Sequence, residues 1–551
     1  MSGGEDLFRR KAVTIMCVAC ILISFARLFF AAELTDESSS IAQEFIFPQT
    51  GRLFEADLFV QSAPAAVIAP LVELYKRTLG VEGFVLFTRF VYFAWAALAA
   101  WASFLFLQRH FRRDLSAIIA CVPMCFYPFS ITGWTYNNVG MCGTVIGISF
   151  LMLRSSWAAA FSALAICVTC FSYPPLTFLF AVVIPWYFFR SRAPLVQRLI
   201  FLGVFLLGCG VVASLVLGAG RDNIHRVIEF TKAFEWVGGW KKVSKIFLHL
   251  GYALSRSGLV VVLGVLWWTR KRAGRLAPGK NDSWFLIGCV LLTLFSGMKT
   301  QQTMGFMVYA PIAMLAFFLI GRLRWSAEFL KGFEVRLALG FGFGAALITG
   351  YFSSNMVMNA ALGMIIPLQI LGLESARALE SSGKVSTKWA PRFLLMILMI
   401  LAIGNYRYIY RDEPIYRLTS RIAEGPFKGV FSHQDRAQML TELYRDISKA
   451  SQGRTSIFAA YLAPAYYQAD LKPLTGMLFL HDGVIWTDET MRLALYHTID
   501  LGIWPDIVVS RKEEGHLDGN RFEDFFKSGQ PYEVFADNQW YRILVRQGAE
   551  K

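Results

Sequence analysis

Charged residues are scarce in this chain: Asp, Glu, Lys and Arg make up 17% of its 551 residues, whereas hydrophobic residues make up 55%. Soluble domains carry about 25% charged residues, and the apolar residues here come in long runs. This scarcity predicts a polytopic α-helical membrane protein. The net charge of +15 does not indicate nucleic-acid binding, because Lys and Arg recur in every second short loop, as orientation by cytoplasmic positive charge requires.

Motifs for metal, thiol or nucleotide chemistry are also missing. The nine cysteines lie in or beside apolar runs and the seven histidines are scattered. The pairs Cys17/Cys20 and Cys167/Cys170 lack a second pair or a histidine cluster, so we interpret them as packing residues and predict no metal site. A need for a divalent cation stays open. There is no P-loop, no Gly-x-Ser-x-Gly and no dinucleotide fingerprint, which argues against a nucleotide-linked donor.

Long apolar runs dominate residues 1–404. About 20 apolar residues span the hydrocarbon core, and on this rule we count about thirteen transmembrane helices. The loops alternate between basic and neutral or acidic, and the basic set, which begins at Arg9, is expected in the cytoplasm. An odd number of crossings then places residues 405–551 outside the cytoplasm. We expect a bacterial inner-membrane protein with a cytoplasmic N-terminus and a periplasmic C-terminal domain.

Two polar regions are expected to be structured. The first outer loop, residues 33–83, carries apolar residues at helical spacing between Ala63 and Gly83, which favours a helix at the membrane interface. Residues 405–551 have an ordinary soluble composition and predict a small α/β domain without disulfides, because they contain no cysteine. Its expected elements are a helix over Ser432–Lys449 and strands over Thr455–Tyr461, Asp506–Ser510 and Trp540–Arg546.

Candidate catalytic residues begin the first outer loop. Asp36 and Glu37 follow Thr35 and open a predicted short helix, where Thr35 is a candidate cap and the helix dipole keeps a carboxylate ionised. Adjacent helical residues point about 100° apart, so one of the two acids is expected to face a substrate. The alternative is a cap followed by a solvated acid.

The arrangement of these residues resembles the GT-C superfamily of integral-membrane glycosyltransferases. Arg27 near the outer end of the first helix, then Thr-Asp-Glu at 35–37, a long outer loop, and Arg89 early in the next helix carry the resemblance. The layout is similar to the aminoarabinose transferases and the protein O-mannosyltransferases, and about thirteen helices before an outer soluble domain fit the aminoarabinose-transferase-like branch best.

The resemblance implies a reaction and a role for Asp36. Such enzymes use polyprenyl-phosphate-linked sugars, and their first-loop Asp acts on the acceptor hydroxyl or amine, with inversion at the sugar. Many relatives carry a further acid in the loop between the third and fourth helices, but residues 132–138 here contain none. Glu55 and Asp57 are therefore the candidates for a second acid, and solvated loop acids are the alternative.

Further candidates would contact the donor phosphate or a sugar. Lys299, in a short outer turn, and the group Arg221, His225 and Arg226 are candidates for the phosphate, with solvated or interfacial cations as the alternative. Trp134, Tyr136 and Asn137 are candidates for sugar or acceptor contacts, with interfacial packing as the alternative.

We therefore expect a transferase that moves a sugar from an undecaprenyl-phosphate-type carrier to a lipid, glycan or protein acceptor on the periplasmic face. An O-antigen polymerase or ligase is a second reading, which would depend on basic residues in large outer loops. A transporter or flippase of a glycolipid is the third, and its marks would be charges at mid-membrane or symmetric halves, which the sequence does not show.

Overall fold

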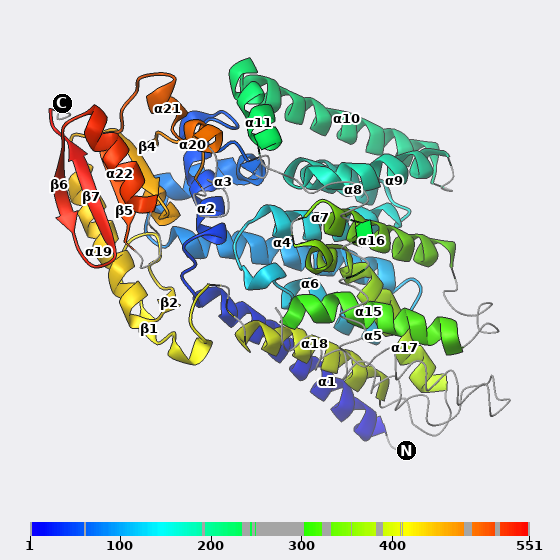
Figure 1. Ribbon diagram of the computed structural model, residues 1–551. Coiled ribbons are helices and arrows are strands. Elements are labelled where there is room, and N and C mark those ends of the chain that lie inside the picture. Colours follow the sequence, from blue (N-terminus) through cyan, green and yellow to red (C-terminus); the bar gives the residue numbers. More distant parts are fainter. Residues whose placement is uncertain are drawn as a thin grey trace.

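The computed structural model describes residues 3–59, 62–189, 193–233, 243–244, 248, 302–321, 332–353, 355–381, 389–407, 409, 411–478, 488–512 and 518–548. Within these ranges, a bundle of helices forms one end of the molecule and a small α/β region forms the other, with helices α2 and α3 between them (Figure 1). The first turns of α1 and the sheet of the α/β region lie at opposite ends of the molecule (Figure 1).

Helices of the bundle come from both halves of the chain. They are α1 (Gly3–Ala26), α4 (Phe84–Leu107), α5 (Arg113–Ala120), α6 (Val122–Cys125), α7 (Tyr136–Leu151), α8 (Ser156–Ser172), α9 (Thr177–Phe189), α10 (Leu195–Gly218), α15 (Gln302–Gly321), α16 (Phe333–Tyr351), α17 (Ile365–Ser381) and α18 (Trp389–Arg407). Small residues allow close approach, since a Cβ on Gly147 of α7 would lie 2.9 Å from Ile166 of α8.

Five described helices are long and apolar enough to cross a membrane, and a bent pair, Met356–Gly363 with Ile365–Ala378, makes a sixth if it forms one span. The five are Lys11–Phe29, Phe84–Leu107, Leu195–Gly218, Phe333–Tyr351 and Trp389–Tyr406. The predicted polytopic helical fold is confirmed. The number of about thirteen spans stays a prediction, because residues 249–301 and 322–331 lie outside the described part of the chain.

Two helices of the loop between α1 and α4 lie between the bundle and the α/β region (Figure 1). Helix α2 (Asp36–Thr50) ends at Gly51, whose φ of 62° gives the left-handed cap that glycine adopts without steric penalty. Helix α3 (Pro64–Leu79) confirms the helix expected between Ala63 and Gly83. A third helix, α11 (Arg221–Ala233), follows α10 and packs against α20 of the tail.

The α/β region, called the tail below, has the elements that its sequence predicts. Its five-stranded sheet has the order β4-β3-β5-β7-β6, in which β4, β3 and β5 are parallel and β7 and β6 are antiparallel to their neighbours. The elements are β1 (Ser420–Arg421), β2 (Phe431–Ser432), α19 (Gln434–Ala450), β3 (Ser456–Ala460), β4 (Lys472–Pro473), α20 (Asp488–Ala494), α21 (Tyr496–Ile499), β5 (Ile507–Arg511), α22 (Asp518–Gly529), β6 (Tyr532–Asp537) and β7 (Tyr541–Arg546). The predicted helix and three predicted strands are confirmed as α19, β3, β5 and β7, whereas the domain boundary at 404/405 stays a prediction.

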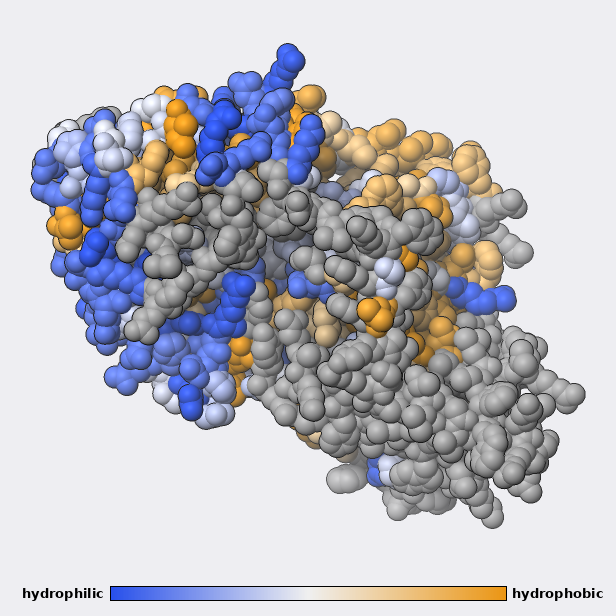
Figure 2. All heavy atoms as spheres, viewed as in Figure 1, coloured by the Kyte–Doolittle hydropathy of each residue, from blue (hydrophilic) through white to orange (hydrophobic). Residues whose placement is uncertain are grey.

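The tail is fixed to the segment that leaves α1. The Ala31 N–H donates to the carbonyl of Phe431 at 2.9 Å, and the Ala32 N–H donates to Asp412 Oδ2 at 3.0 Å. The Asp412 side chain is fully buried and forms an ion pair with Arg436 at 3.2 Å. Figure 2 shows hydrophilic residues over the tail and apolar residues over the bundle, so the segment between α1 and α2 lies where the two kinds of surface meet.

Candidate active site

Glu33 caps helix α2. Its carboxylate accepts hydrogen bonds from the N–H groups of Thr35 and Glu37, each at 2.7 Å, and from the Thr35 hydroxyl. These are two of the N–H groups that a helix N-terminus leaves without an intrahelical partner. Thr35 is the N-cap residue, as expected, but its side chain makes no cap hydrogen bond and donates to the Glu33 carboxylate.

Glu37 forms a buried ion pair with Arg89 of α4. Arg89 Nε donates to Glu37 Oε1 at 2.9 Å, and Arg89 Nη2 donates to Glu37 Oε2 at 2.6 Å. The side chains of Arg89 and Glu37 are 0% and 4% exposed. This two-pronged geometry is the strong form of an arginine–carboxylate pair. Glu37 is therefore held within the protein.

Arg89 also organises the chain between α1 and α2. Its remaining N–H groups donate to the carbonyls of Leu28 at 2.7 Å and Ala31 at 2.8 Å. On the other side of Glu37, the Thr132 hydroxyl donates to Oε1 at 3.3 Å, and a Cβ on Gly133 would lie 3.0 Å from the same atom. The start of α2 is thus held against α4 and the loop before α7.

Asp36 points away from this buried pair. Its side chain is partly exposed, and its carboxylate accepts no hydrogen bond and forms no ion pair within the ranges that the structure describes. The two nearest acids in sequence, Glu33 and Glu37, are both buried and engaged. Of the two acids expected at this helix start, Asp36 is the one that the geometry leaves open to a ligand.

Charges from the loop and the tail meet at the start of α2. Burial and the nearby charge of Asp36 raise the pKa of Glu33 to about 7. Arg411 of the tail donates to the Thr35 hydroxyl at 2.5 Å, and burial together with the nearby guanidinium of Arg436 lowers the pKa of Arg511 to about 10. The sequence reading missed these arginines, because nothing in their local sequence signals a contact with a segment almost 400 residues earlier.

Arg27, which follows the last residue of α1, is buried and donates hydrogen bonds to the backbone. Its guanidinium donates to the carbonyls of Phe30 at 2.5 Å, Ser130 at 3.1 Å and Asn405 at 3.2 Å. It is 1% exposed, so backbone carbonyls take the place of water around its guanidinium. Arg27 thus joins the end of α1 to the segments of Ser130 and Asn405.

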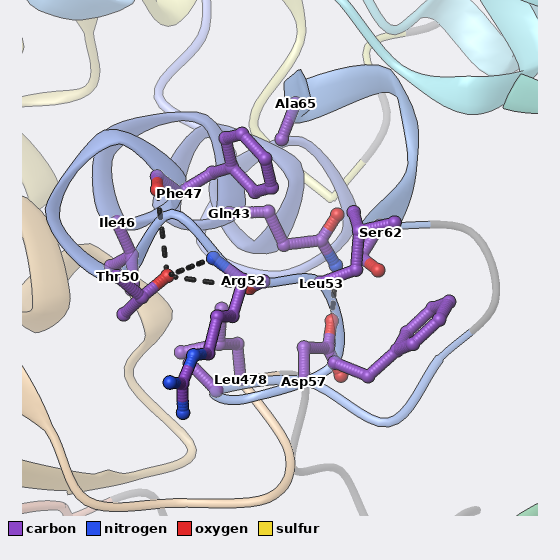
Figure 3. A pocket seen from close by; sticks show the side chains of 12 residues that line it. Gln43, Ile46, Phe47, Thr50, Arg52, Leu53, Asp57, Ser62, Ala65 and Leu478 are labelled. Carbon is purple, nitrogen blue, oxygen red and sulfur yellow. Dashed lines mark hydrogen bonds between the residues drawn. The ribbon is translucent and has the colours of Figure 1, made fainter. Parts of the chain in front are cut away.

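The two candidate second acids have different surroundings. Glu55 is partly exposed and forms an ion pair with Lys472 of the tail at 3.2 Å. Asp57 is 3% exposed, accepts a hydrogen bond from the side-chain amide of Gln43, and lines a pocket beside α2 (Figure 3). Burial raises the pKa of Asp57 to about 7. Asp57 contacts Gln43, which lies about 10 Å along the axis of α2 from Asp36, so the structure does not pair the two acids at one reacting atom.

The candidate sugar contacts lie in the loop that meets Glu37. Trp134 is 4% exposed and donates from Nε1 to the carbonyl of Pro64 at 3.0 Å. Tyr136 stacks on Tyr173 with ring centroids 5.6 Å apart. Asn137 is 7% exposed, and its Oδ1 has no hydrogen-bond partner within the described residues. Trp134 and Tyr136 are engaged in packing, whereas Asn137 keeps an acceptor available.

The candidate phosphate ligands are spread over α11. Arg221 is exposed, and His225 faces Glu229 with a separation of 3.3 Å between Nδ1 and Oε1. The Arg226 guanidinium lies 4.0 Å from the ring centroid of Tyr496 in the tail, which is a cation–π contact. Arg226 therefore joins α11 to the tail. Lys299 lies outside the described residues.

No group of three potential metal ligands occurs among the residues that the structure describes. One further acid near the site is Glu44 of α2, which is 1% exposed and whose two carboxylate oxygens have no hydrogen-bond partner in the described ranges. Burial, and then the charge of Glu37, raises its pKa. A neutral carboxylic acid at this position is a poor ligand for a cation.

These features define a class of architecture: a helical membrane bundle, a structured loop after the first helix with a partly exposed acid, and an α/β tail. Two solved structures of ArnT, a GT-C aminoarabinose transferase, from Cupriavidus metallidurans are similar to this chain. One is bound to undecaprenyl phosphate and aligns with a TM-score of 0.46; the other is in the apo state and aligns with a TM-score of 0.43. Each has 12% sequence identity, and each alignment covers 98% of this chain and 99% of the other. No family model matches the chain, and no curated protein matches its sequence.

Proposed function

We propose that this protein is a GT-C-type glycosyltransferase that moves a sugar from a polyprenyl-phosphate carrier to a hydroxyl or amine of an acceptor. One observation carries the proposal. Among three acids at the start of α2, Glu33 and Glu37 are fixed by protein partners, whereas the Asp36 carboxylate is partly exposed where the bundle meets the tail. Such a carboxylate is placed to meet a lipid-tethered donor and a second substrate together.

The role we assign to Asp36 is that of general base. The acceptor oxygen or nitrogen attacks the anomeric carbon and gives its proton to the Asp36 carboxylate, the bond from that carbon to the phosphate oxygen breaks, and the lipid phosphate leaves with the electron pair. Attack from the face opposite the phosphate inverts the sugar. The base must lie within hydrogen-bond reach of the acceptor proton, and its charge also balances positive charge at the anomeric carbon.

The tail brings cations to the start of α2. Arg411 contacts Thr35, the residue before Asp36, and Arg511 lies in the same charged neighbourhood as Glu33 and Arg436. Arginine guanidinium groups suit phosphate oxygens because they present several donors in one plane. We assign Arg411 and Arg511 to the phosphate ahead of Arg226, because they lie beside the start of α2 whereas Arg226 contacts Tyr496.

The proposed location is the periplasmic face of a bacterial inner membrane. Two features support this orientation: the basic start of α1 carries Arg9, Arg10 and Lys11, and it lies at the opposite end of the molecule from the tail (Figure 1). A lipid, glycan or protein acceptor would then be met outside the cytoplasm.

The test compares purified wild type with Asp36→Asn, using a panel of polyprenyl-phosphate sugars and a membrane glycolipid extract as acceptor. We expect the variant to lose about 10²-fold to 10⁴-fold in turnover, the usual contribution of a general base. Glu73→Gln, which makes the same acid-to-amide change at an exposed acid of α3, is the matched control and should keep the wild-type rate. Transfer by Asp36→Asn at the wild-type rate, in a folded preparation, would refute the role of Asp36.

A further inference from the structure

Helix α2 has one open face. Asp36, Ser40, Gln43, Phe47 and Thr50 are partly exposed, whereas most of the helix is buried. Their spacing of four, three, four and three residues keeps them on one side of an α-helix. The open face therefore begins at Asp36 and continues along the whole helix.

The far part of this face lines a shallow pocket that is open to solvent, and about 300 Å³ of empty space, part of it open solvent, lies between its walls (Figure 3). Helix α2 supplies Gln43, Phe47 and Thr50, the loop before α3 supplies Asp57, and the tail supplies Leu478. At 1.5 Å per residue, Gln43 lies about 10 Å along the helix axis from Asp36. A short oligosaccharide can bridge this distance.

The polar groups of the pocket are buried. Asp57 and Ser62 are 3% and 5% exposed, and Asp57 accepts a hydrogen bond from the Gln43 amide. The Ser62 hydroxyl, by contrast, has no hydrogen-bond partner in the part of the chain that the structure describes. A buried hydroxyl without a partner is unfavourable, so its place in a pocket wall indicates a polar ligand.

The polar and aromatic groups in the pocket wall indicate which class of ligand the pocket binds. A lipid chain would cover Asp57 and Ser62 without satisfying either, which is unfavourable. An anionic head group would meet Arg52 at the exposed edge of the pocket, but deeper in the pocket the Asp57 carboxylate, when ionised, would repel it. A neutral sugar ring offers hydroxyls to Asp57, Gln43 and Ser62, and it offers its apolar C–H face to Phe47 or Phe54, both in the pocket wall.

We propose that this pocket binds a neutral sugar residue of the acceptor, about 10 Å along α2 from the group that is glycosylated at Asp36. The proposal rests on the proposed function, and it deepens it by naming the acceptor class. The acceptor is a glycan or glycolipid with at least one sugar beyond the attacked residue. The tail contributes Leu478 to the pocket wall. The tail also holds the loop that carries Asp57, because the Leu58 N–H donates to the carbonyl of Gly476 at 2.9 Å.

A matched pair of variants tests the pocket. Ala65→Leu places a larger side chain in the pocket wall, whereas Ala66→Leu adds the same volume at the next residue of α3, which does not line the pocket. The probes are methyl β-cellobioside and chitobiose, and their binding to the purified full-length chain is measured by saturation-transfer NMR.

We expect saturation transfer with wild type and with Ala66→Leu. With Ala65→Leu the signal should be at least about tenfold weaker, because the larger leucine side chain occupies the space that the sugar ring would need. Ser62→Ala, which adds no bulk, should weaken binding about fivefold, the value of one net hydrogen bond. Equal signals for Ala65→Leu and Ala66→Leu, or no signal with wild type for either probe, would overturn the proposal.

Asp36→Asn separates this proposal from the proposed function. The variant should still bind the probes, because Asp36 lies outside the pocket wall. If Asp36→Asn transfers sugar normally while Ala65→Leu no longer binds the probes, the catalytic role of Asp36 is refuted and the proposed sugar binding in the pocket is supported. If Asp36→Asn is inactive while Ala65→Leu binds the probes as wild type does, the proposed sugar binding in the pocket is refuted and the catalytic role of Asp36 is supported.

Discussion

The two faces of helix α2 use the same chemical group for different purposes. On the buried face, Glu37 is paired with Arg89 and fixes the helix against α4. On the open face, Asp36 is partly exposed and leads to the pocket of Gln43 and Asp57. The comparison teaches that a carboxylate with its own buried cation becomes part of the framework, whereas a carboxylate without one is available to a substrate.

The second acid of the buried face, Glu44, has neither a cation among the described residues nor access to solvent. Glu44 follows Glu37 by seven residues and therefore lies on the same side of α2. Arg89 already donates to Glu37 and to backbone carbonyls, and Glu44 has no hydrogen-bond partner in the described ranges. Its pKa is raised as a result of burial and of the Glu37 charge. The buried cation Arg89 thus satisfies the carboxylate of Glu37, whereas burial favours the neutral form of Glu44.

The largest effect is expected when the buried pair is broken. Arg89→Met leaves Glu37 buried and unpaired, so the free energy of unfolding should fall by about 3–5 kcal/mol. Chemical unfolding in detergent measures it. The matched control is Arg77→Met, which removes the exposed pair with Glu73 on α3 and should change the free energy by less than about 1 kcal/mol.

The double variant Glu37→Gln/Arg89→Met sharpens this result. It removes both charges, so it should be less destabilised than Arg89→Met alone. A double variant as unstable as the sum of the two single variants would show that the pair is not the source of the effect.

The open face should respond to pH through Asp57. Burial raises its pKa from an ordinary value of 3.8 to about 7, so the folded state binds this proton more tightly than the unfolded state. The stability that this gives is fully present below about pH 4 and is lost as the pH rises through about 7. At roughly 1.4 kcal/mol per pKa unit, the loss is at most about 4 kcal/mol.

Asp57→Asn removes this titration. The difference in unfolding temperature between wild type and variant should favour wild type more strongly at about pH 5 than at about pH 8. Glu33, whose pKa is also raised to about 7, remains in both proteins and cancels in the difference. A difference that does not change with pH would mean that Asp57 is not buried as described.

Much of the framework could be predicted from the sequence. Helix α3 followed from apolar spacing, and α19, β3, β5 and β7 followed from local patterns in the tail. The different environments of the Asp36 and Glu37 side chains followed from the helical period alone, because adjacent residues on a helix point in different directions. These features depend on neighbours within a few residues, and such patterns are visible in one chain.

The partners that decide each acid's role could not be predicted. Arg89 lies 52 residues after Glu37, and no local pattern joins them. Thr35 was expected as the cap because of its residue type, but Glu33 reaches two N–H groups where Thr35 reaches none. One signal was available for the pocket: Gln43 follows Asp36 by seven residues, which places both on one side of α2.

A smaller effect is expected where the loop before α7 touches Glu37. A Cβ on Gly133 would lie 3.0 Å from Glu37 Oε1 and 3.1 Å from its Cγ. Gly133→Ala should therefore destabilise the protein by about 1–3 kcal/mol, as overpacking does. Gly210→Ala in α10, where a Cβ would meet nothing within 4 Å, should be neutral or stabilising by up to about 1 kcal/mol. Equal unfolding free energies for the two variants would contradict the close fit at Glu37.

The smallest effects compare two serines on the two faces. On the buried face, the Ser38 hydroxyl donates to the carbonyl of Glu33 and accepts from Tyr467 at 2.8 Å, so Ser38→Ala leaves a buried tyrosine hydroxyl unsatisfied. This should reduce the free energy of unfolding by about 1–2 kcal/mol. Ser40 bonds locally to the Asp36 carbonyl at 3.1 Å, and Ser40→Ala should stay within about 0.5 kcal/mol of wild type. Both measurements use the same unfolding curves. A larger effect for Ser40 than for Ser38 would reverse the assignment of the two faces, because Ser38 bonds to a tyrosine of the tail, whereas Ser40 bonds only within its own helix.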